Sequence, residues 1–291
     1  MPKYRKPLPA ELPEPEIIDL EALAADLRSG AVELVCVLGP TASGKTKYAV
    51  RLARELAGKG LEAEIISAES RQVYRGMDIG TGKDLAEYEE IPYHLIDIRE
   101  AGTQYNVYDF VQDFRVAYAD IRARGKVAIL CGGTGLYINA VTAGYDFRTS
   151  KPLSAPGAGS GGNSATATHG PAQKTSVTAT ASPPSIPSTF YIGTLVAREV
   201  RNARIDARLR ARLQEGMVDE IRGLLAGGVP AETLIGYGLE YKFVTLYLQG
   251  QLDEQELFEK LSTAIHQFAK RQMTWFRGME RSGVKIHWIE V

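Results

Sequence analysis

The sequence predicts an α/β fold in which a parallel β-sheet is flanked by helices. Apolar runs of strand length alternate along the chain with amphipathic segments of helix length, the pattern of βαβ units. The runs are mainly apolar throughout, which is typical of strands buried on both faces of a parallel sheet. A glycine-rich loop joins the first such strand, residues 31–40, to the helix that follows.

The elements follow from apolar spacing and from glycine stops. The first helix repeats apolar residues at helical spacing over residues 17–30 and closes on Gly30. The other predicted helices span residues 46–60, 108–126, 134–145, 198–228 and 253–281. The predicted strands span residues 31–40, 62–70, 94–98, 126–133, 190–196 and 284–291.

The composition is that of a globular protein without a strong overall field. The 291 residues are 44% apolar and 24% charged with a net charge of −1, so any nucleic-acid surface must be a local patch. Cys36 and Cys131 each end an apolar run, which indicates buried thiols; a disulfide is the less favoured alternative. Zinc-type Cys/His spacing, a signal-peptide core and a membrane-length apolar run are all missing, so we expect a cytoplasmic protein without a membrane span.

Composition divides the chain into four parts. The expected parts are a tail and helix over residues 1–30, the first part of the core over 31–148, a low-complexity segment over 149–189 and the second part of the core over 190–291. The low-complexity segment consists largely of Ser, Thr, Ala, Gly and Pro and is predicted to be a disordered linker. It is either a native flexible linker or a segment that has lost a folded insert.

The loop GPTASGKT, residues 39–46, is a candidate phosphate site. The residues that satisfy G-x-x-x-x-G-K-[ST] are Gly39, Gly44, Lys45 and Thr46. The glycines let backbone N–H groups surround an anion at the positive end of the next helix, where Lys45 adds a charge and the Thr46 hydroxyl can face Mg²⁺. A chance match in a tight turn is the alternative. With this loop the expected sheet is P-loop NTPase-like.

The acidic partner of an ATP-hydrolysing loop is hard to find in this sequence. In such proteins a later apolar strand usually ends in a Mg²⁺-binding aspartate. Here the predicted strand 126–133 ends in Cys131 and two glycines, and Asp97 in strand 94–98 is the remaining candidate. We therefore expect the loop to grip a phosphate group without hydrolysing it.

Glu69 is a candidate general base. It follows the second predicted strand, in the stretch SAESRQVYRGMDIGTGKD over residues 67–84. Ligands of a parallel α/β sheet bind at the carboxyl ends of the strands, so this carboxylate should lie across from the phosphate loop. There it could accept a proton from a nucleophile. The alternatives are a helix cap or an ion pair with Arg71.

Several sequence blocks occur in the order found in one enzyme family. They are GPTASGKT, ISAESRQVYRGMDIGTGK, YHLIDI, GGTGLYINA, IGYGLEY and AKRQMTWFR, spread over residues 34–147 and about 191–289. On these blocks the sequence resembles the tRNA dimethylallyltransferases, a family of isopentenyltransferases. The resemblance implies transfer of a dimethylallyl group from dimethylallyl diphosphate to N6 of adenosine 37, beside the tRNA anticodon, with Mg²⁺ and with release of diphosphate.

The resemblance also implies roles for individual residues. The implied diphosphate site is Gly39, Pro40, Thr41, Ala42, Ser43, Gly44, Lys45 and Thr46, with Thr46 on the Mg²⁺ side. The residues implied to contact the substrate tRNA are Glu69, Ser70, Arg71, Gln72 and Thr134. Glu69 stands where the family has an aspartate as general base, and its side chain is longer by one methylene. Thr134 would lie beside the flipped-out adenine, although a helix N-cap is the alternative.

A basic helix follows the low-complexity segment. Its arginines that share one face are Arg201, Arg204, Arg208 and Arg212. Six arginines against one glutamate and one aspartate give residues 198–212 a local charge of +4. A solvated basic face is the alternative. The resemblance, however, places Arg208 at the position of the arginine that contacts the departing diphosphate in the family. This makes Arg208 a catalytic candidate together with Glu69 and Thr134.

The stretch HQFAKRQMTWFRGMER near the C-terminus interleaves cations with aromatic residues. By itself it suits contacts with RNA phosphates and bases. We favour instead an amphipathic helix with Phe268 and Trp275 in the core, and a structural role for His266.

The resemblance thins between the two parts of the core. The family carries a mostly helical insertion there that grips the anticodon arm, and the low-complexity segment occupies its place, so we expect weak tRNA affinity. Three other functions stay open: prenylation of free adenine nucleotides, a P-loop phosphotransfer, and an impaired remnant that binds without turnover. We expect a monomer whose partners are tRNA and dimethylallyl diphosphate.

Overall fold

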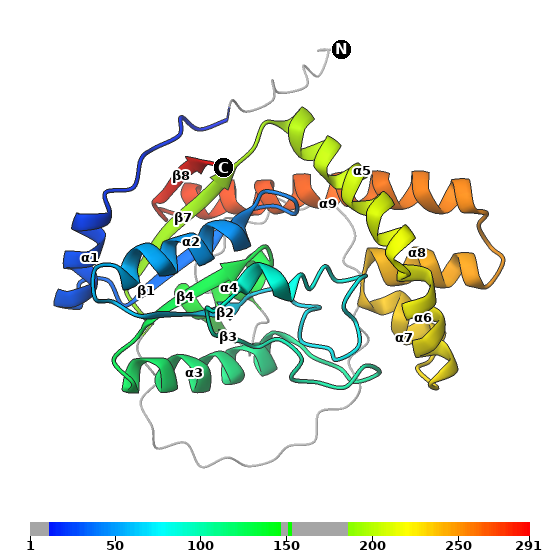
Figure 1. The fold of residues 1–291 in the computed structure, drawn as a ribbon, viewed down its shortest axis with the longest axis horizontal. Helices are drawn as coiled ribbons and strands as arrows, with labels where there is room; N and C mark the ends of the chain where they lie inside the picture. Colours follow the sequence, from blue (N-terminus) through cyan, green and yellow to red (C-terminus); the bar gives the residue numbers. More distant parts are fainter. Residues whose placement is uncertain (1–11, 147–150, 153–185) are drawn as a thin grey trace.

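A six-stranded sheet with every neighbouring pair parallel organises the fold (Figure 1). The computed structural model describes residues 12–146, 151–152 and 186–291. In spatial order the strands are β3 (Tyr93–His94), β2 (Ala63–Ser67), β4 (Val127–Gly132), β1 (Leu34–Leu38), β7 (Thr189–Leu195) and β8 (Ile286–Glu290). Because β1 pairs with β4 and with β7, the two parts of the core form one sheet. The predicted α/β fold is confirmed.

Helices cover both faces of the sheet. Because successive residues of a strand point to opposite sides, neighbouring residues of one strand pack against different helices. The helices that flank the sheet are α1 (Leu20–Ser29), α2 (Lys45–Ala57), α3 (Val107–Ala123), α4 (Gly135–Thr142) and α9 (Glu254–Arg281). Leu34, Cys36 and Leu38 of β1 pack in the core cluster that contains residues of α3, α4 and α9. Val35 and Val37 pack in a second cluster with residues of α1 and α2. The alternation within one strand thus places helices on both sides.

Three of these helices, α1, α3 and α9, begin at a side chain that caps them. Asp19 accepts hydrogen bonds from two backbone N–H groups at the start of α1, and Gly30, with φ of 78°, ends that helix. Asn106 and Asp109 form a capping box at the start of α3. Helix α2 differs, because Gly44 precedes it with φ of 79° and no side chain caps it. Its first N–H groups therefore remain available to an anion.

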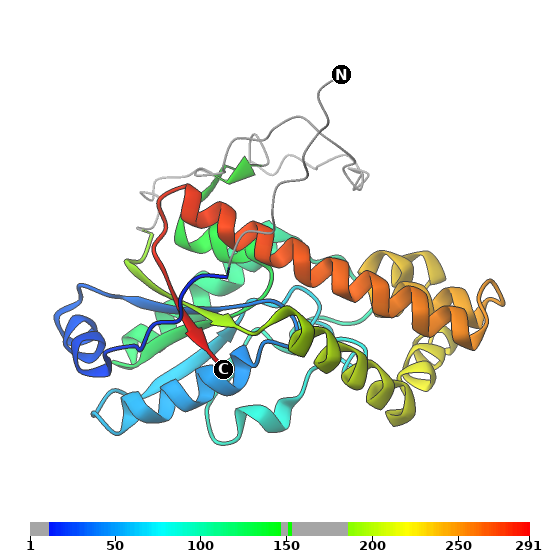
Figure 2. The same cartoon turned by 90° about the horizontal axis from the view of Figure 1, so that it is seen from above.

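The predicted helix 198–228 is wrong as one helix. It is divided into α5 (Arg198–Glu215) and α6 (Met217–Ala226) by Gly216, whose φ of 107° is incompatible with a continuous helix. Two further helices, α7 (Ala231–Tyr237) and α8 (Leu239–Leu248), were not predicted. Helices α6, α7 and α8 lie beyond one end of the sheet, and α9 runs from them back to β8 (Figures 1 and 2).

The predicted strand 94–98 is also too long. Strand β3 ends at His94, and Leu95 and Asp97 have positive φ values of 63° and 55°. Beyond β3 the backbone follows the loop after β2 instead of the sheet, since the Asp97 N–H donates to the carbonyl of Gln72 at 3.1 Å. The chain leaves the sheet to make that contact.

Most of the predicted low-complexity segment lies outside the described residues, as does most of the predicted tail. Within the segment, β6 (Lys151–Pro152) pairs antiparallel with β5 (Tyr145–Asp146), and Thr189 already belongs to β7. Cys36 and Cys131 are free and buried, as predicted. Burial raises the pKa of the Cys131 thiol to about 12. Within the described part of the chain, every helix is too short or too polar to cross a membrane.

Glu64 of β2 is a buried carboxylate surrounded by three basic side chains. Its side chain is 3% exposed and accepts from Arg124 Nη2 at 2.8 Å, with Lys126 Nζ at 3.1 Å and His94 Nε2 at 2.7 Å. Hydrogen bonds from Arg124 lower the pKa of Glu64 to about 2, against the opposing effect of burial. Because the folded pKa lies below the ordinary value of 4.5, the cluster stabilises the fold above about pH 4.5. That contribution is lost as pH falls toward 2.

We predict that Glu64→Gln lowers the free energy of unfolding by roughly 3 kcal/mol near neutral pH, since it breaks a buried ion pair. The difference in the free energy of unfolding between Glu64→Gln and the unmodified protein should shrink as pH falls from about 4.5 to 2. Denaturant unfolding at a series of pH values measures both. Glu62→Gln is the matched control, because Glu62 contacts the same Lys126 but is 73% exposed, and it should change stability little. A difference for Glu64→Gln that is independent of pH would contradict the assignment.

Candidate active site

The phosphate loop and the turns after β2 and β4 meet in one cleft at the carboxyl ends of these strands. The cleft has a volume of about 1040 Å³. The sequence-predicted site residues that line it are Thr41, Ala42, Ser43, Gly44, Lys45, Thr46, Glu69, Ser70, Arg71, Gln72, Thr134 and Arg208. Gly39 and Pro40 are buried and do not line it. The topology thus brings together residues that are far apart in the sequence.

The backbone of the phosphate loop is shaped to face an anion. Ala42 and Gly44 have left-handed conformations, with φ of 59° and 79°. Left-handed residues in such a loop turn successive N–H groups toward one point. The loop is fixed to β7 by a 2.6 Å hydrogen bond between the hydroxyls of Ser43 and Thr194. A Cβ atom at Gly39 would overlap both of these hydroxyls, so only glycine fits there.

The Glu69 carboxylate is held between the phosphate loop and a backbone N–H group. Its Oε1 lies 2.9 Å from Nζ of Lys45 and accepts a 2.9 Å hydrogen bond from the N–H of Gly133. Both alternatives for Glu69, a helix cap and a pair with Arg71, are wrong. The side chain is 24% exposed. A charged oxygen is therefore fixed beside the anion-binding loop and open to the cleft.

Thr134 links the turns that follow β2 and β4. It occupies the N-cap position of α4, but its side chain makes no capping hydrogen bond. Its Oγ1 instead accepts from the N–H of Ser70 at 3.2 Å. Nearby, the guanidinium of Arg71 lies 5.7 Å from the ring centroid of Tyr237, which also lines the cleft. Hydroxyl, guanidinium and aromatic groups thus face the same space.

Gln272 of α9 joins the phosphate loop to the Gly133 turn, and sequence analysis assigned it no role. Its Oε1 accepts from the N–H of Thr41 at 2.8 Å, and its Nε2 donates to the carbonyl of Gly133 at 3.0 Å. The side chain is 5% exposed. Because the N–H of Gly133 holds Glu69, one side chain connects the anion loop with the carboxylate. The only sequence signal for Gln272 was its place in the block AKRQMTWFR.

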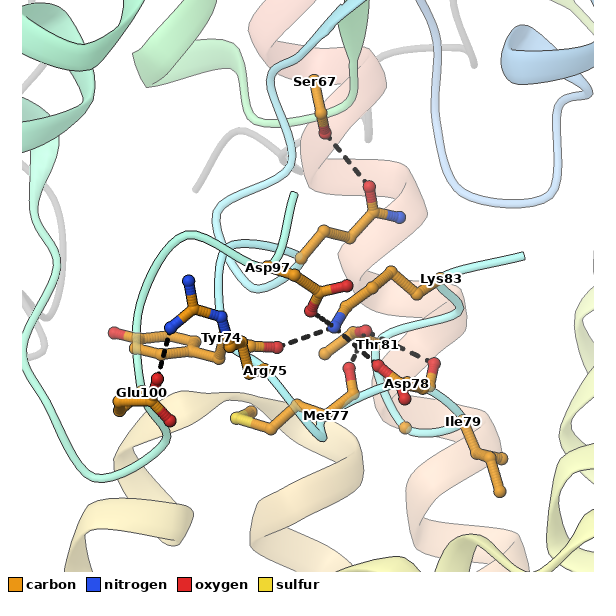
Figure 3. Close-up of polar contacts among 12 residues, drawn as sticks. Ser67, Tyr74, Arg75, Met77, Asp78, Ile79, Thr81, Lys83, Asp97 and Glu100 are labelled. Carbon is orange, nitrogen blue, oxygen red and sulfur yellow. Dashed lines mark hydrogen bonds and ion pairs between the residues drawn. The ribbon is translucent and has the colours of Figure 1, made fainter. Parts of the chain in front are cut away.

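A buried lysine anchors the loop that follows Gln72 (Figure 3). The Lys83 side chain is fully buried and donates to the carbonyl of Tyr74 and to Asp78, each at 2.6 Å. It also pairs with Asp97. Asp97 is thereby engaged and does not line the cleft, so its candidacy as the acidic partner of the phosphate loop is wrong.

Glu220 of α6 holds the same loop from the other side. Its carboxylate accepts from the N–H groups of Asp78, Ile79 and Gly80 at 2.8, 2.7 and 3.1 Å. The hydroxyl of Tyr241 on α8 donates to it at 2.7 Å. The helices beyond the end of the sheet therefore shape the wall of the cleft.

The basic face of α5 only partly faces the cleft. Arg204, Arg208 and Arg212 line it, whereas Arg201 does not. Arg208 pairs with Asp84. The arginine face predicted from spacing is thus split, with its C-terminal members at the site.

The interpretation of the aromatic residues of α9 was wrong. Phe268 and Trp275 are 39% and 38% exposed, and Phe268 lines the cleft beside Arg271. Phe276 is the one that is fully buried, because it falls on the same helical stripe as Gln272. His266 lies 3.0 Å from Asp206 and outside the cleft lining.

Comparison with known proteins assigns the family. The family model described as IPP transferase matches residues 72–170 and 164–279. A tRNA dimethylallyltransferase 2 of Porphyromonas gingivalis is 50% identical, with 88% of this chain and 93% of that protein covered. The chain belongs to the IPP transferase family. A tRNA dimethylallyltransferase 1 of Parabacteroides distasonis is 48% identical over 89% of this chain and 92% of its own length.

A solved IPP transferase shares the fold. The full-length tRNA isopentenylpyrophosphate transferase of Bacillus halodurans superposes with a TM-score of 0.68, at 27% identity, and the match covers 89% of each chain.

The donors in this IPP transferase cleft suit Mg²⁺ only in part. The described residues contain no group of three or more His, Cys, Asp or Glu that could hold a metal ion. The oxygen donors lining the cleft near the phosphate loop include Thr46, Glu69 and Glu87. Mg²⁺ commonly keeps waters and takes its other ligands from substrate phosphates, so a single hydroxyl such as that of Thr46 fits.

We predict that Gln272→Met lowers the transfer rate of this IPP transferase roughly ten- to a hundred-fold. The substitution leaves the N–H of Thr41 and the carbonyl of Gly133 without partners, each costing about 1–3 kcal/mol, and lets the two turns separate. Steady-state transfer assays with a thermal melt measure the effect. Gln267→Met, an exposed glutamine of the same helix, is the control. A Gln272→Met protein with an unchanged rate would remove the bridge from the catalytic apparatus.

Proposed function

We propose that this chain transfers a dimethylallyl group from dimethylallyl diphosphate to N6 of adenosine 37 in tRNA and releases diphosphate. One observation carries the proposal: the Glu69 carboxylate lies 2.9 Å from Lys45 of an anion-binding loop. The reaction needs a site for an anionic leaving group directly beside a base for the nucleophile. The names of the relatives support tRNA as the acceptor.

The proposed reaction is transfer at carbon rather than at phosphorus. As the N6 lone pair attacks the allylic carbon, the C–O bond breaks and its electron pair passes to the diphosphate oxygen. The loop N–H groups, Lys45 and Arg208 would neutralise that developing charge. The N6 proton becomes acidic once the C–N bond forms, and Glu69 would accept it. Atoms and charges balance without hydrolysis of a phosphate bond.

The acceptor adenine would enter the cleft that Glu69 lines. A base must leave its stack before N6 can reach the carboxylate. Thr134 accepts a hydrogen bond from the turn that carries Glu69, and the guanidinium of Arg71 lies over the ring of Tyr237 nearby. These groups could contact the edge and the face of an extruded adenine. Ser70 and Gln72 line the same wall.

We include Mg²⁺, a monomeric state and a cytoplasmic location in the proposal. Thr46 would hold the ion, which supplies further charge neutralisation for the diphosphate when bound. Transfer RNA as the acceptor supports the cytoplasm.

Radiolabelled dimethylallyl diphosphate, offered with either a tRNA transcript or AMP, tests the proposal. We expect label in tRNA, at N6 of adenosine 37, and none in a transcript with guanosine there. Label in AMP alone would favour prenylation of free nucleotides. Label from the γ-phosphate of ATP without dimethylallyl transfer would overturn both. No transfer, with diphosphate binding retained, would indicate a remnant.

We predict that Glu69→Gln lowers the transfer rate about 10²- to 10⁴-fold, the usual range for loss of a general base. Binding of inorganic pyrophosphate should be retained, since glutamine still accepts from Gly133 and releases Lys45 from its carboxylate. Glu69→Ala should behave alike, whereas Glu69→Asp should keep substantial transfer because a carboxylate remains. Single-turnover assays and calorimetric titration measure the two properties. Unchanged turnover in Glu69→Gln would exclude Glu69 as the base.

A further inference from the structure

Two guanidinium groups of α5 converge at one point beside the loop after β2. A Cβ atom built on Gly82 would overlap the guanidinium of Arg212 and lie 3.0 Å from Nη2 of Arg208. The two arginines are four residues apart and so share one helix face. Their charged ends therefore meet at the cleft wall.

Only one of these two cations has a countercharge in direct contact. Arg208 pairs with Asp84. The guanidinium of Arg212 makes no hydrogen bond or ion pair within the described part of the chain, although the residue is partly buried. Burial and the neighbouring charge of Arg208 lower its pKa to about 10. The negative charge of Glu240 opposes this only in part, and burial raises the pKa of Glu240 itself. Two converging cations of this kind are stabilised by an anion.

The position of Arg212 identifies which anion it would meet. It lines a small cavity together with Thr41 and Ala42 of the phosphate loop, and it also lines the main cleft. The remaining walls of the small cavity are three aliphatic side chains, Ile205, Leu209 and Ile265, and the two charged side chains of Arg208 and Glu240. An anion in contact with Arg212 is thus beside the phosphate loop and partly shielded from water.

We propose that Arg212 is a second guanidinium that binds the diphosphate leaving group, in addition to Arg208. It donates charge-assisted hydrogen bonds to a phosphate oxygen while the C–O bond breaks and the electron pair moves onto the diphosphate. No proton is transferred by this residue. The inference rests on the proposed function, because it takes the loop's anion to be the diphosphate. A phosphate of the RNA backbone has the same chemistry, and the test separates the two.

The variant Arg212→Met tests the proposal, and Arg210→Met is its control. Arg210 is exposed on the same helix, and its guanidinium lies over the ring of Phe258 at 4.8 Å, so the control removes the same charge outside the cleft. With Mg²⁺ present, titration with inorganic pyrophosphate should show a roughly ten- to a hundred-fold weaker Kd for Arg212→Met. Arg210→Met should stay near the unmodified protein. Arg212→Lys should be intermediate, because it keeps the charge without the fork of donors.

Steady-state kinetics decide between the two phosphate sources. We expect a higher KM for dimethylallyl diphosphate and a lower kcat, at unchanged KM for tRNA. A folded Arg212→Met protein that binds pyrophosphate normally would overturn the proposal, and a higher KM for tRNA alone would assign the arginine to the RNA backbone. If Arg212→Met fails to fold, Arg212→Lys carries the same test. If the unmodified protein transfers no prenyl group but Arg212→Met still binds pyrophosphate more weakly, the anion contact of Arg212 is supported and the proposed function is rejected.

Discussion

The rest of the site depends on the contact of Glu69 with Lys45 and with the N–H of Gly133. It joins the turns after three strands, because Lys45 follows β1, Glu69 follows β2 and Gly133 follows β4. These strands are neighbours in the order β2-β4-β1, and parallel strands present their carboxyl ends at one edge. The sheet therefore fixes the separation between an anion site and a carboxylate before any ligand binds. Such preorganisation is what electrostatic catalysis requires.

The second part of the chain completes this arrangement. Gln272 reaches from α9 to both the phosphate loop and Gly133, and Thr194 of β7 holds Ser43. Glu220 and Lys83 fix opposite sides of the loop that carries Asp78. The contacts of Gln272, Thr194 and Glu220 join segments that pack only when the whole core is folded, so the conformation of the phosphate loop depends on residues more than 140 positions away, such as Thr194 and Gln272.

Sequence patterns predicted the elements whose signals are local. The alternation of apolar strands and amphipathic helices, the phosphate loop and the carboxylate of Glu69 can each be read within about twenty residues. Gln272 could not be found in this way, because its partners are defined only by packing. The helix break at Gly216 was missed because the apolar spacing continues through it, and a single glycine need not end a helix. Phe268 was misplaced because an aromatic residue on a helix flank can face either the core or a ligand.

The charges of the cleft are arranged for an exchange of partners. Lys45 pairs with Glu69, and Arg208 pairs with Asp84. In the proposed reaction, a diphosphate that takes Lys45 as a partner would release the Glu69 carboxylate, whose lone pair would then be free to accept the N6 proton. The cost of separating each ion pair is offset by the new contact, because charge-assisted hydrogen bonds replace others of the same kind. Gly133 keeps the carboxylate in place during the exchange, since its N–H group donates to Glu69 independently of Lys45. In the proposed reaction, binding of the leaving group and release of the base would thus both follow from one contact.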